Sequence, residues 1–132
     1  MIVDAENQVM GRLSSEVASL LLDGKEVKVI NSEKAIKTGK PEDTVKKYLK
    51  KKSIGDPRHG PYSSLRPENI LRDSIKGMLP TEKEIGRQAL KRLVIVQGNS
   101  GEEGKAISKS AEDLTTNYIT LEELSERIGG KQ

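Results

Sequence analysis

The chain has 132 residues, of which 33% are hydrophobic and 33% charged, and it contains no cysteine. This length fits one domain with a modest core. The lack of cysteine excludes disulfides, thiolate metal sites and cysteine nucleophiles, and it suits a reducing cytosol. The first residues carry no cationic leader, and nowhere do about 18 apolar residues follow one another. We therefore expect an untargeted cytoplasmic domain without a membrane segment.

The first thirty residues have the pattern of a strand, a helix and a second strand. Ile2–Asp4 and Glu26–Ile30 are the strand candidates, and the helix is predicted over residues 11–23, before Gly24. One face of this helix is apolar at i, i+4, i+7 and i+8: Leu13, Val17, Leu20 and Leu21. Because crossovers between neighbouring parallel strands are right-handed, this unit predicts a parallel sheet.

Three helices are expected in the middle of the chain. One begins at Pro41, and one runs from Pro67 to Gly77 with Leu71, Ile75 and Met78 on its apolar face. The third begins at about Thr81. Its two sides are predicted to differ, with Lys83, Arg87 and Lys91 on a cationic side and Ile85, Ala89 and Leu93 facing the protein.

The last third begins with Leu93–Val96, a continuous run that predicts a central strand covered by helices on both faces. After Gly98 the chain is polar and glycine-rich, as in a linker. Thr120 and Glu123 form a capping box for a short helix near residues 120–128. We therefore divide the chain into an α/β domain of residues 1–98 and an acidic C-terminal extension of residues 99–132.

The charge is concentrated in residues 46–92, which hold 13 Lys or Arg against 5 Asp or Glu. The lysine run of residues 46–52 by itself fits a solvated helix end. One sign of charge spread over three helices and a loop instead favours a large polyanionic partner such as a nucleic acid. Because only three tyrosines and no Phe or Trp are present, base stacking is not expected. Recognition of folded RNA by phosphate, ribose and shape is expected instead.

Two enzyme-like features were weighed against structural interpretations. The only histidine, His59, lies in the loop Asp56–Tyr62, but no nucleophile or second base accompanies it, so a polar contact is favoured over catalysis. Gly11 stands at a helix start, yet the three glycines of a dinucleotide fingerprint and the Gly-Lys-Ser or Gly-Lys-Thr of a phosphate loop are lacking. We expect no catalytic residue, cofactor, metal or small-molecule substrate.

Several ordered motifs resemble the L13 family of large-subunit ribosomal proteins, over about residues 1–98. They are Ile2–Ala5, Gly11–Ser15, Asn31–Ala35, His59–Tyr62, Lys76–Pro80, Gly86–Leu90 and Leu93–Gly98. His59–Tyr62 and the ending at residues 120–129 are similar to the archaeal and eukaryotic branch. The resemblance implies an α/β fold, a three-layer α/β/α domain with a small, mainly parallel four-stranded sheet. It also implies a structural constituent of the ribosome that is not an enzyme.

The resemblance further implies binding to large-subunit, 23S-type rRNA early in subunit assembly, beside neighbouring large-subunit proteins. Combined with the charge pattern, it gives the predicted rRNA-binding residues: Arg12, Lys50, Lys51, Lys52, Arg58, His59, Arg66, Arg72, Lys76, Lys83, Arg87, Lys91 and Arg92. The chain departs from the family at Lys76, where Arg is frequent, and at Ile85, where a cation often stands. Ser100 also occupies a place where Pro is common.

Two other functions remain open at this point. A small α/β enzyme or nucleotide-binding protein would use the C-terminal ends of the strands as its pocket. An RNA-binding regulator that acts off the ribosome would present the same basic surface. Nucleotide-dependent stabilisation would distinguish the first, and co-sedimentation with the large subunit would distinguish the second.

Overall fold

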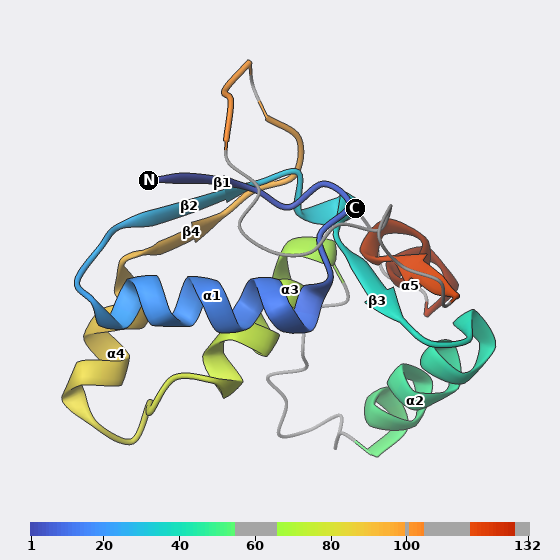
Figure 1. Cartoon of the computed structure of the whole chain (residues 1–132). Coiled ribbons are helices and arrows are strands. Elements are labelled where there is room, and N and C mark those ends of the chain that lie inside the picture. The colour runs from blue at the N-terminus through green and yellow to red at the C-terminus, as the bar shows by residue number, and fades with distance from the viewer. Residues whose placement is uncertain (55–65, 100, 105–116, 129–132) are drawn as a thin grey trace.

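A parallel three-stranded sheet forms one side of the molecule (Figure 1). The computed structural model describes residues 1–54, 66–99, 101–104 and 117–128. The strands are β1 (Ile2–Asp4), β2 (Val27–Ile30) and β4 (Leu93–Ile95), in the order β1-β2-β4. Both pairings are parallel. The strand order makes β2 the central strand and places β4 at an edge in the described part of the chain.

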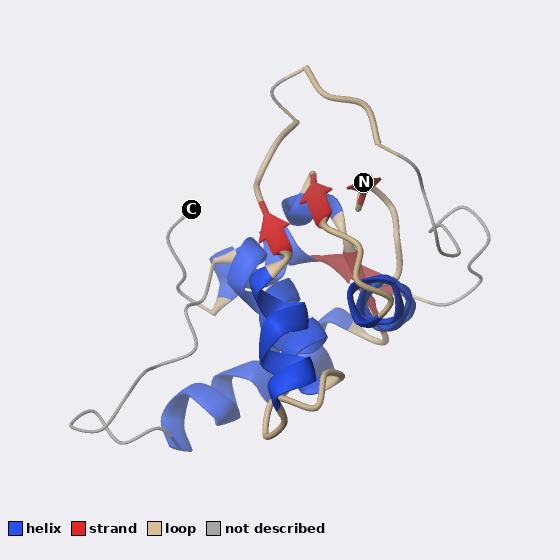
Figure 2. Cartoon of the chain, turned by 90° about the vertical axis from the view of Figure 1, so that its left-hand side faces the viewer, coloured by secondary structure: helices blue, strands red, loops and turns tan. Residues whose placement is uncertain are grey.

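One face of this sheet packs against helices. Helix α1 (Met10–Leu22) runs below the strands in Figure 1, next to α3 (Pro67–Gly77) and α4 (Glu84–Lys91). Figure 2 shows α1 along its axis, beside the strands that it covers. Val3, Val29 and Leu93 are buried on this face, together with Leu13 and Val17 of α1. Burial of such side chains contributes roughly 1.5–3 kcal/mol each.

The opposite face of the sheet is more open. Val94 is 51% exposed there, and Lys28 forms an ion pair with Glu102 in the segment that follows β4. This segment approaches β1 so closely that a Cβ on Gly104 would lie 2.8 Å from the Asp4 nitrogen. Among the described residues, the loop segment 101–104 lies near this face, whereas α1, α3 and α4 lie on the other side of the sheet (Figure 1).

A second, antiparallel pair of strands lies beside this body. It joins β3 (Ile36–Thr38) to β5 (Tyr118–Thr120), and α5 (Leu121–Arg127) follows β5 directly. The Thr120 hydroxyl accepts a hydrogen bond from the Glu123 N–H at 3.2 Å, which caps α5. A short 3₁₀ helix, η1 (Ser32–Lys34), connects β2 to β3 and contacts both α3 and α5.

Side chains of residues 118–128 belong to the same core as those of the parallel sheet. Four of them are almost fully buried: Ile119, Leu121, Leu124 and Ile128. The Leu121 N–H also donates to the Ala35 carbonyl at 2.9 Å. Residues 118–128 therefore complete the core. The division of the chain at residue 98 into an RNA-binding domain and a C-terminal extension stays a prediction.

Helix α2 (Pro41–Ile54) begins at the predicted proline and packs against α5. Val45 and Tyr48 are partly buried against the core, whereas Leu49 is exposed. Burial, followed by the nearby negative charge of Asp73, raises the pKa of the Tyr48 phenol. The tyrosine therefore remains a neutral packing residue near α3.

The α/β class and the mainly parallel sheet are confirmed. In the described residues, however, the strands divide three and two between separate sheets, where one sheet of four was expected. Leu93–Val96 was expected to form a central strand, but among the described residues β4 pairs only with β2 and lies at an edge of the sheet. No helix among the described residues is long and apolar enough to cross a membrane.

Candidate nucleic-acid interface

The predicted cations of α3 and α4 are held by two successive helices. Lys76 is exposed in the last turn of α3, and Lys83 is the exposed N-cap residue of α4. Lys91 is exposed in the last turn of α4. Within the described part of the chain, none of these three ammonium groups has a hydrogen-bond or ion-pair partner. They are therefore available to an external anion.

The other predicted cations differ in position and exposure. Arg12 is exposed in the first turn of α1, Arg66 is the exposed N-cap residue of α3, and Arg72 is half-buried within α3. Lys50, Lys51 and Lys52 belong to α2, but their side chains lie outside the described part. Arg58 and His59 fall within residues 55–65, which also lie outside the described residues. The RNA-binding roles of all these residues stay predictions.

Arg92 contacts the protein itself. One guanidinium nitrogen donates to the Leu21 carbonyl at 2.7 Å, in the last turn of α1, and the Nε atom is buried without a partner in the described residues. A cation at a helix C-terminus satisfies a free carbonyl and interacts favourably with the helix dipole. Arg92 therefore ties α4 to α1, and only part of its guanidinium remains for another partner.

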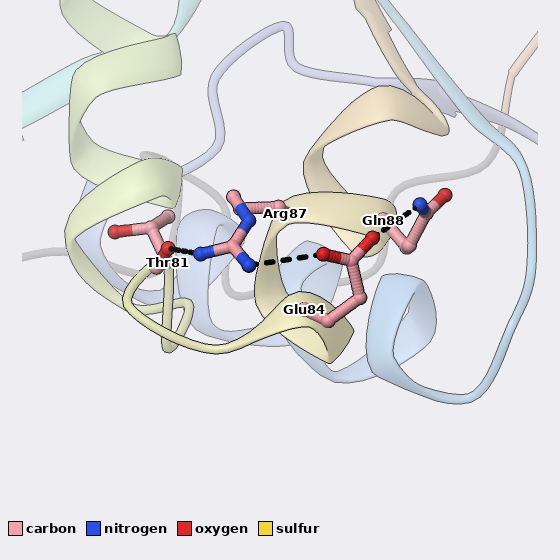
Figure 3. Close-up of polar contacts among 4 residues, drawn as sticks. All are labelled: Thr81, Glu84, Arg87 and Gln88. Atoms are coloured by element: carbon pink, nitrogen blue, oxygen red, sulfur yellow. Dashed lines mark hydrogen bonds and ion pairs between the residues drawn. The ribbon is translucent and has the colours of Figure 1, made fainter.

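Arg87 is also held by neighbouring groups (Figure 3). Its Nη1 donates to the Thr81 carbonyl at 3.2 Å, and its Nη2 donates to Glu84 Oε2 at 2.9 Å. The other carboxylate oxygen, Oε1, accepts from Gln88 Nε2 at 2.7 Å. Hydrogen bonds from Gln88 and then from Arg87 lower the pKa of Glu84, with a smaller contribution from the charge of Lys91. The carboxylate therefore stays charged beside Arg87.

The turn before α4 makes a close backbone contact with this helix. A Cβ on Gly86 would lie 2.0 Å from the Pro80 carbonyl oxygen and 2.9 Å from the Thr81 nitrogen. The Lys83 N–H also donates to the Pro80 carbonyl at 3.0 Å. Since only glycine permits such an approach, Gly86 fixes the Pro80–Thr81 turn against α4 and places the Thr81 carbonyl within reach of Arg87.

The orientation predicted for Ile85 was wrong. The residue is 56% exposed, and the buried positions of α4 are Gly86 and Ala89. The helix starts at Glu84 rather than near Thr81, and the contact of Gly86 with the Pro80 carbonyl determines which side faces the core. Met78, expected on the apolar face of α3, follows that helix and is 45% exposed.

The C-terminal edge of the parallel sheet is occupied by groups of the chain itself. The Asn31 amide donates to Asp4 at 3.0 Å, and the Ser32 hydroxyl donates to the Val96 carbonyl at 3.0 Å. Both carboxylate oxygens of Glu33 accept from the Gly98 N–H, at 2.8 and 3.2 Å. Ligands of α/β proteins usually bind at this edge. Here, these internal contacts use its polar groups, which gives no support to the nucleotide-binding alternative.

The partners of Arg87 and Arg92 were not predicted from the sequence. The spacing of Glu84 and Arg87, at i and i+3, was an available signal for an ion pair on a helix. The Thr81 and Leu21 carbonyls gave no such signal, because backbone acceptors can be assigned only from the packing of the turn and of α1. The arginines of a basic segment that bind groups of the protein itself can therefore be identified only in the folded chain.

Comparison with known proteins identifies consistent relatives. Residues 1–102 match the family model described as ribosomal protein L13. The large ribosomal subunit protein uL13 of Methanococcus maripaludis is 42% identical, covering 99% of this chain and 98% of that protein. The proteins of the same name from Thermoplasma volcanium and Haloarcula marismortui are 41% and 38% identical, covering 98% and 100% of this chain and 98% and 92% of their own lengths.

Proposed function

This chain belongs to the ribosomal protein L13 family and is a structural constituent of the large ribosomal subunit, and we propose that it binds large-subunit rRNA through the basic surface of α3 and α4. The observation that supports this most directly is that the exposed ammonium groups of Lys76, Lys83 and Lys91 have no hydrogen-bond or ion-pair partner among the described residues. An exposed lysine without an internal partner neutralises a phosphate and releases its counterions. Three such groups on two adjoining helices suit the backbone of one folded RNA.

The composition of this surface favours binding to double-stranded or folded RNA over the stacking of single-stranded bases. No aromatic residue occurs in α3 or α4 that would provide a stacking platform. The Pro80–Thr81 turn connects the two helices and contacts the backbone of α4, so the backbone positions that carry these cations are held close to one another. Recognition then depends on the spacing of phosphates and ribose groups in a folded RNA.

We also propose that the chain binds rRNA early in subunit assembly. Neighbouring large-subunit proteins would then contact its exposed apolar residues. Ile85 and Met78 are candidates for such contacts, since both are exposed close to the basic surface. The family assignment and the relatives' shared name support a position beside other proteins of the large subunit.

The test is a salt titration of binding to a transcript of large-subunit rRNA. A triple Lys76→Ala, Lys83→Ala, Lys91→Ala variant should bind more weakly, and the slope of log affinity against log salt should fall by about three. The matched control replaces three exposed lysines outside the basic segment, Lys25, Lys34 and Lys40, by alanine. An equal loss of slope in both triple variants would contradict this location of the interface.

A further inference from the structure

Arg87 differs from the lysines beside it because its guanidinium is fixed from two directions. The Thr81 carbonyl belongs to the turn before α4, and Glu84 belongs to the first turn of α4 itself (Figure 3). A group held by one partner still rotates about that contact. Two partners on different segments define both the position and the plane of the guanidinium.

The carboxylate that holds Arg87 is itself oriented. Glu84 donates no hydrogen bond but accepts two, from Arg87 at Oε2 and from Gln88 at Oε1. Gln88 lies one helical turn after Glu84, so the three side chains form a short chain of contacts along α4. Gln88 therefore holds the Glu84 carboxylate, and this carboxylate in turn helps to orient the Arg87 guanidinium.

Half of Arg87 remains available to a ligand. The side chain is 52% exposed, and two of the five N–H donors of a guanidinium are used by Thr81 and Glu84. The planar fork of arginine matches two phosphate oxygens at once, whereas a lysine ammonium acts as a compact charge that can rotate. Arg87 thus presents its remaining donors in a plane that its two partners define, whereas no hydrogen bond or ion pair holds the ammonium groups of Lys83 and Lys91 within the described part of the chain.

An acid in the middle of a phosphate-binding surface lowers affinity for every polyanion, because it repels phosphates. The contact of Glu84 with Arg87 is consistent with a gain of another kind. A side chain that is already ordered loses less conformational entropy on binding. That gain is realised only with a ligand whose phosphates match the fixed direction of the fork.

We propose that Glu84 is a positioning residue and that the Glu84–Arg87 pair makes this surface selective for folded rRNA over unstructured RNA. Lys83 and Lys91 then supply affinity for both kinds of RNA. This inference rests on the proposed function, since it describes how the same surface discriminates between RNAs.

The experiment compares two variants that remove one negative charge each. Glu84→Gln weakens the hold on Arg87, whereas Glu82→Gln removes an exposed acid whose carboxylate has no partner in the described part of the chain. Each full-length variant is titrated with a large-subunit rRNA transcript and with poly(U), at the same salt concentration. The measured quantity is the ratio of the two affinities.

Glu82→Gln should strengthen binding to both RNAs by the same factor and leave the ratio unchanged. Glu84→Gln should strengthen binding to poly(U) but lower the ratio by about threefold to tenfold, because Arg87 must then be ordered during binding. Equal ratios in the wild-type protein and both variants would overturn the inference. Thermal unfolding of both variants identifies any change that arises from misfolding.

A second variant tests whether the two residues act together. Arg87→Lys keeps the charge but removes the planar fork, so it should lower the ratio to a similar extent. In the Glu84→Gln, Arg87→Lys double variant the ratio should fall no further, whereas additive losses would contradict a shared role. Failure of the wild-type protein to bind rRNA in a salt-dependent manner would instead refute the proposed function itself.

Discussion

The two sheets of this protein bring together different parts of the chain. The parallel sheet combines β1, β2 and β4 with α1, α3 and α4, and its first two strands are joined by one helix. The antiparallel pair joins residues 36–38 to residues 118–120 and carries α5. The first part positions the basic surface, and the second part covers the core where α5 contacts α3. The comparison shows that cation placement and core completion depend on separate segments.

The largest effect is expected from removing the second part. A chain that ends after Gly104 lacks four buried side chains: Ile119, Leu121, Leu124 and Ile128. Their burial contributes roughly 1.5–3 kcal/mol each, which together approaches the usual total stability of about 5–15 kcal/mol. We expect this chain to lose its cooperative thermal unfolding transition, as followed by circular dichroism.

The control for the truncation removes only residues 129–132, which leaves every described contact in place. It should unfold like the full chain. A cooperative transition in the chain that ends after Gly104 would show that the parallel sheet and its helices form an independent core.

An intermediate effect is expected in the first part from Gly86→Ala. The new Cβ would overlap the Pro80 carbonyl, and the backbone must move to relieve the overlap. Such overpacking typically costs about 1–3 kcal/mol. Chemical denaturation should show this loss, and binding to rRNA should weaken because the Pro80–Thr81 turn orients Arg87.

The matched control is Gly77→Ala at the end of α3. Apart from its chain neighbours and the backbone of its own helix, no described atom lies within 4 Å of the Cβ position there, and the φ angle is not positive. This variant should keep or slightly increase the stability, by up to about 1 kcal/mol. A similar loss in both glycine variants would contradict the role given to the Gly86 contact.

The smallest effect concerns pH. The pKa of Glu84 is lowered in the folded chain, so its ionised form contributes stability that is present above the unfolded pKa. This contribution is lost as the pH falls through the folded pKa. Thermal midpoints of the wild-type protein and Glu84→Gln should therefore differ near neutral pH and converge in acid. A constant difference across that range would show that the carboxylate charge is not responsible.

The sequence predicted the secondary structure of the first part, around the parallel sheet, better than that of the second part, around the antiparallel pair. Helix α3 begins at Pro67 and ends at Gly77 as expected, because the proline, the apolar stripe and the glycine all indicate the same boundaries. Strands β3 and β5 were not predicted. Each has three residues, and Ile36–Thr38 shows no long β-branched run, so only pairing with a distant segment defines it.

Within the candidate site, the positions of the cations were predictable but their partners were not. Lys83 and Lys91 are exposed as the helical spacing indicated. Arg92 is held by a carbonyl of α1, and Ile85 faces solvent because the Gly86 contact sets the rotation of α4. Such contacts depend on how close two backbones approach, and a periodicity of apolar residues carries no information about that distance.

The pairing of β3 with β5 also has a consequence for the order of folding during synthesis. The ribosome releases residues 36–38 long before residues 118–120, so β3 must wait for its partner strand. Until then the Ala35 carbonyl lacks the Leu121 N–H, and the side of the core that α5 covers is open. The helices that carry the basic surface have already been synthesised by that time. The nascent chain thus displays its cations before its hydrophobic core can close.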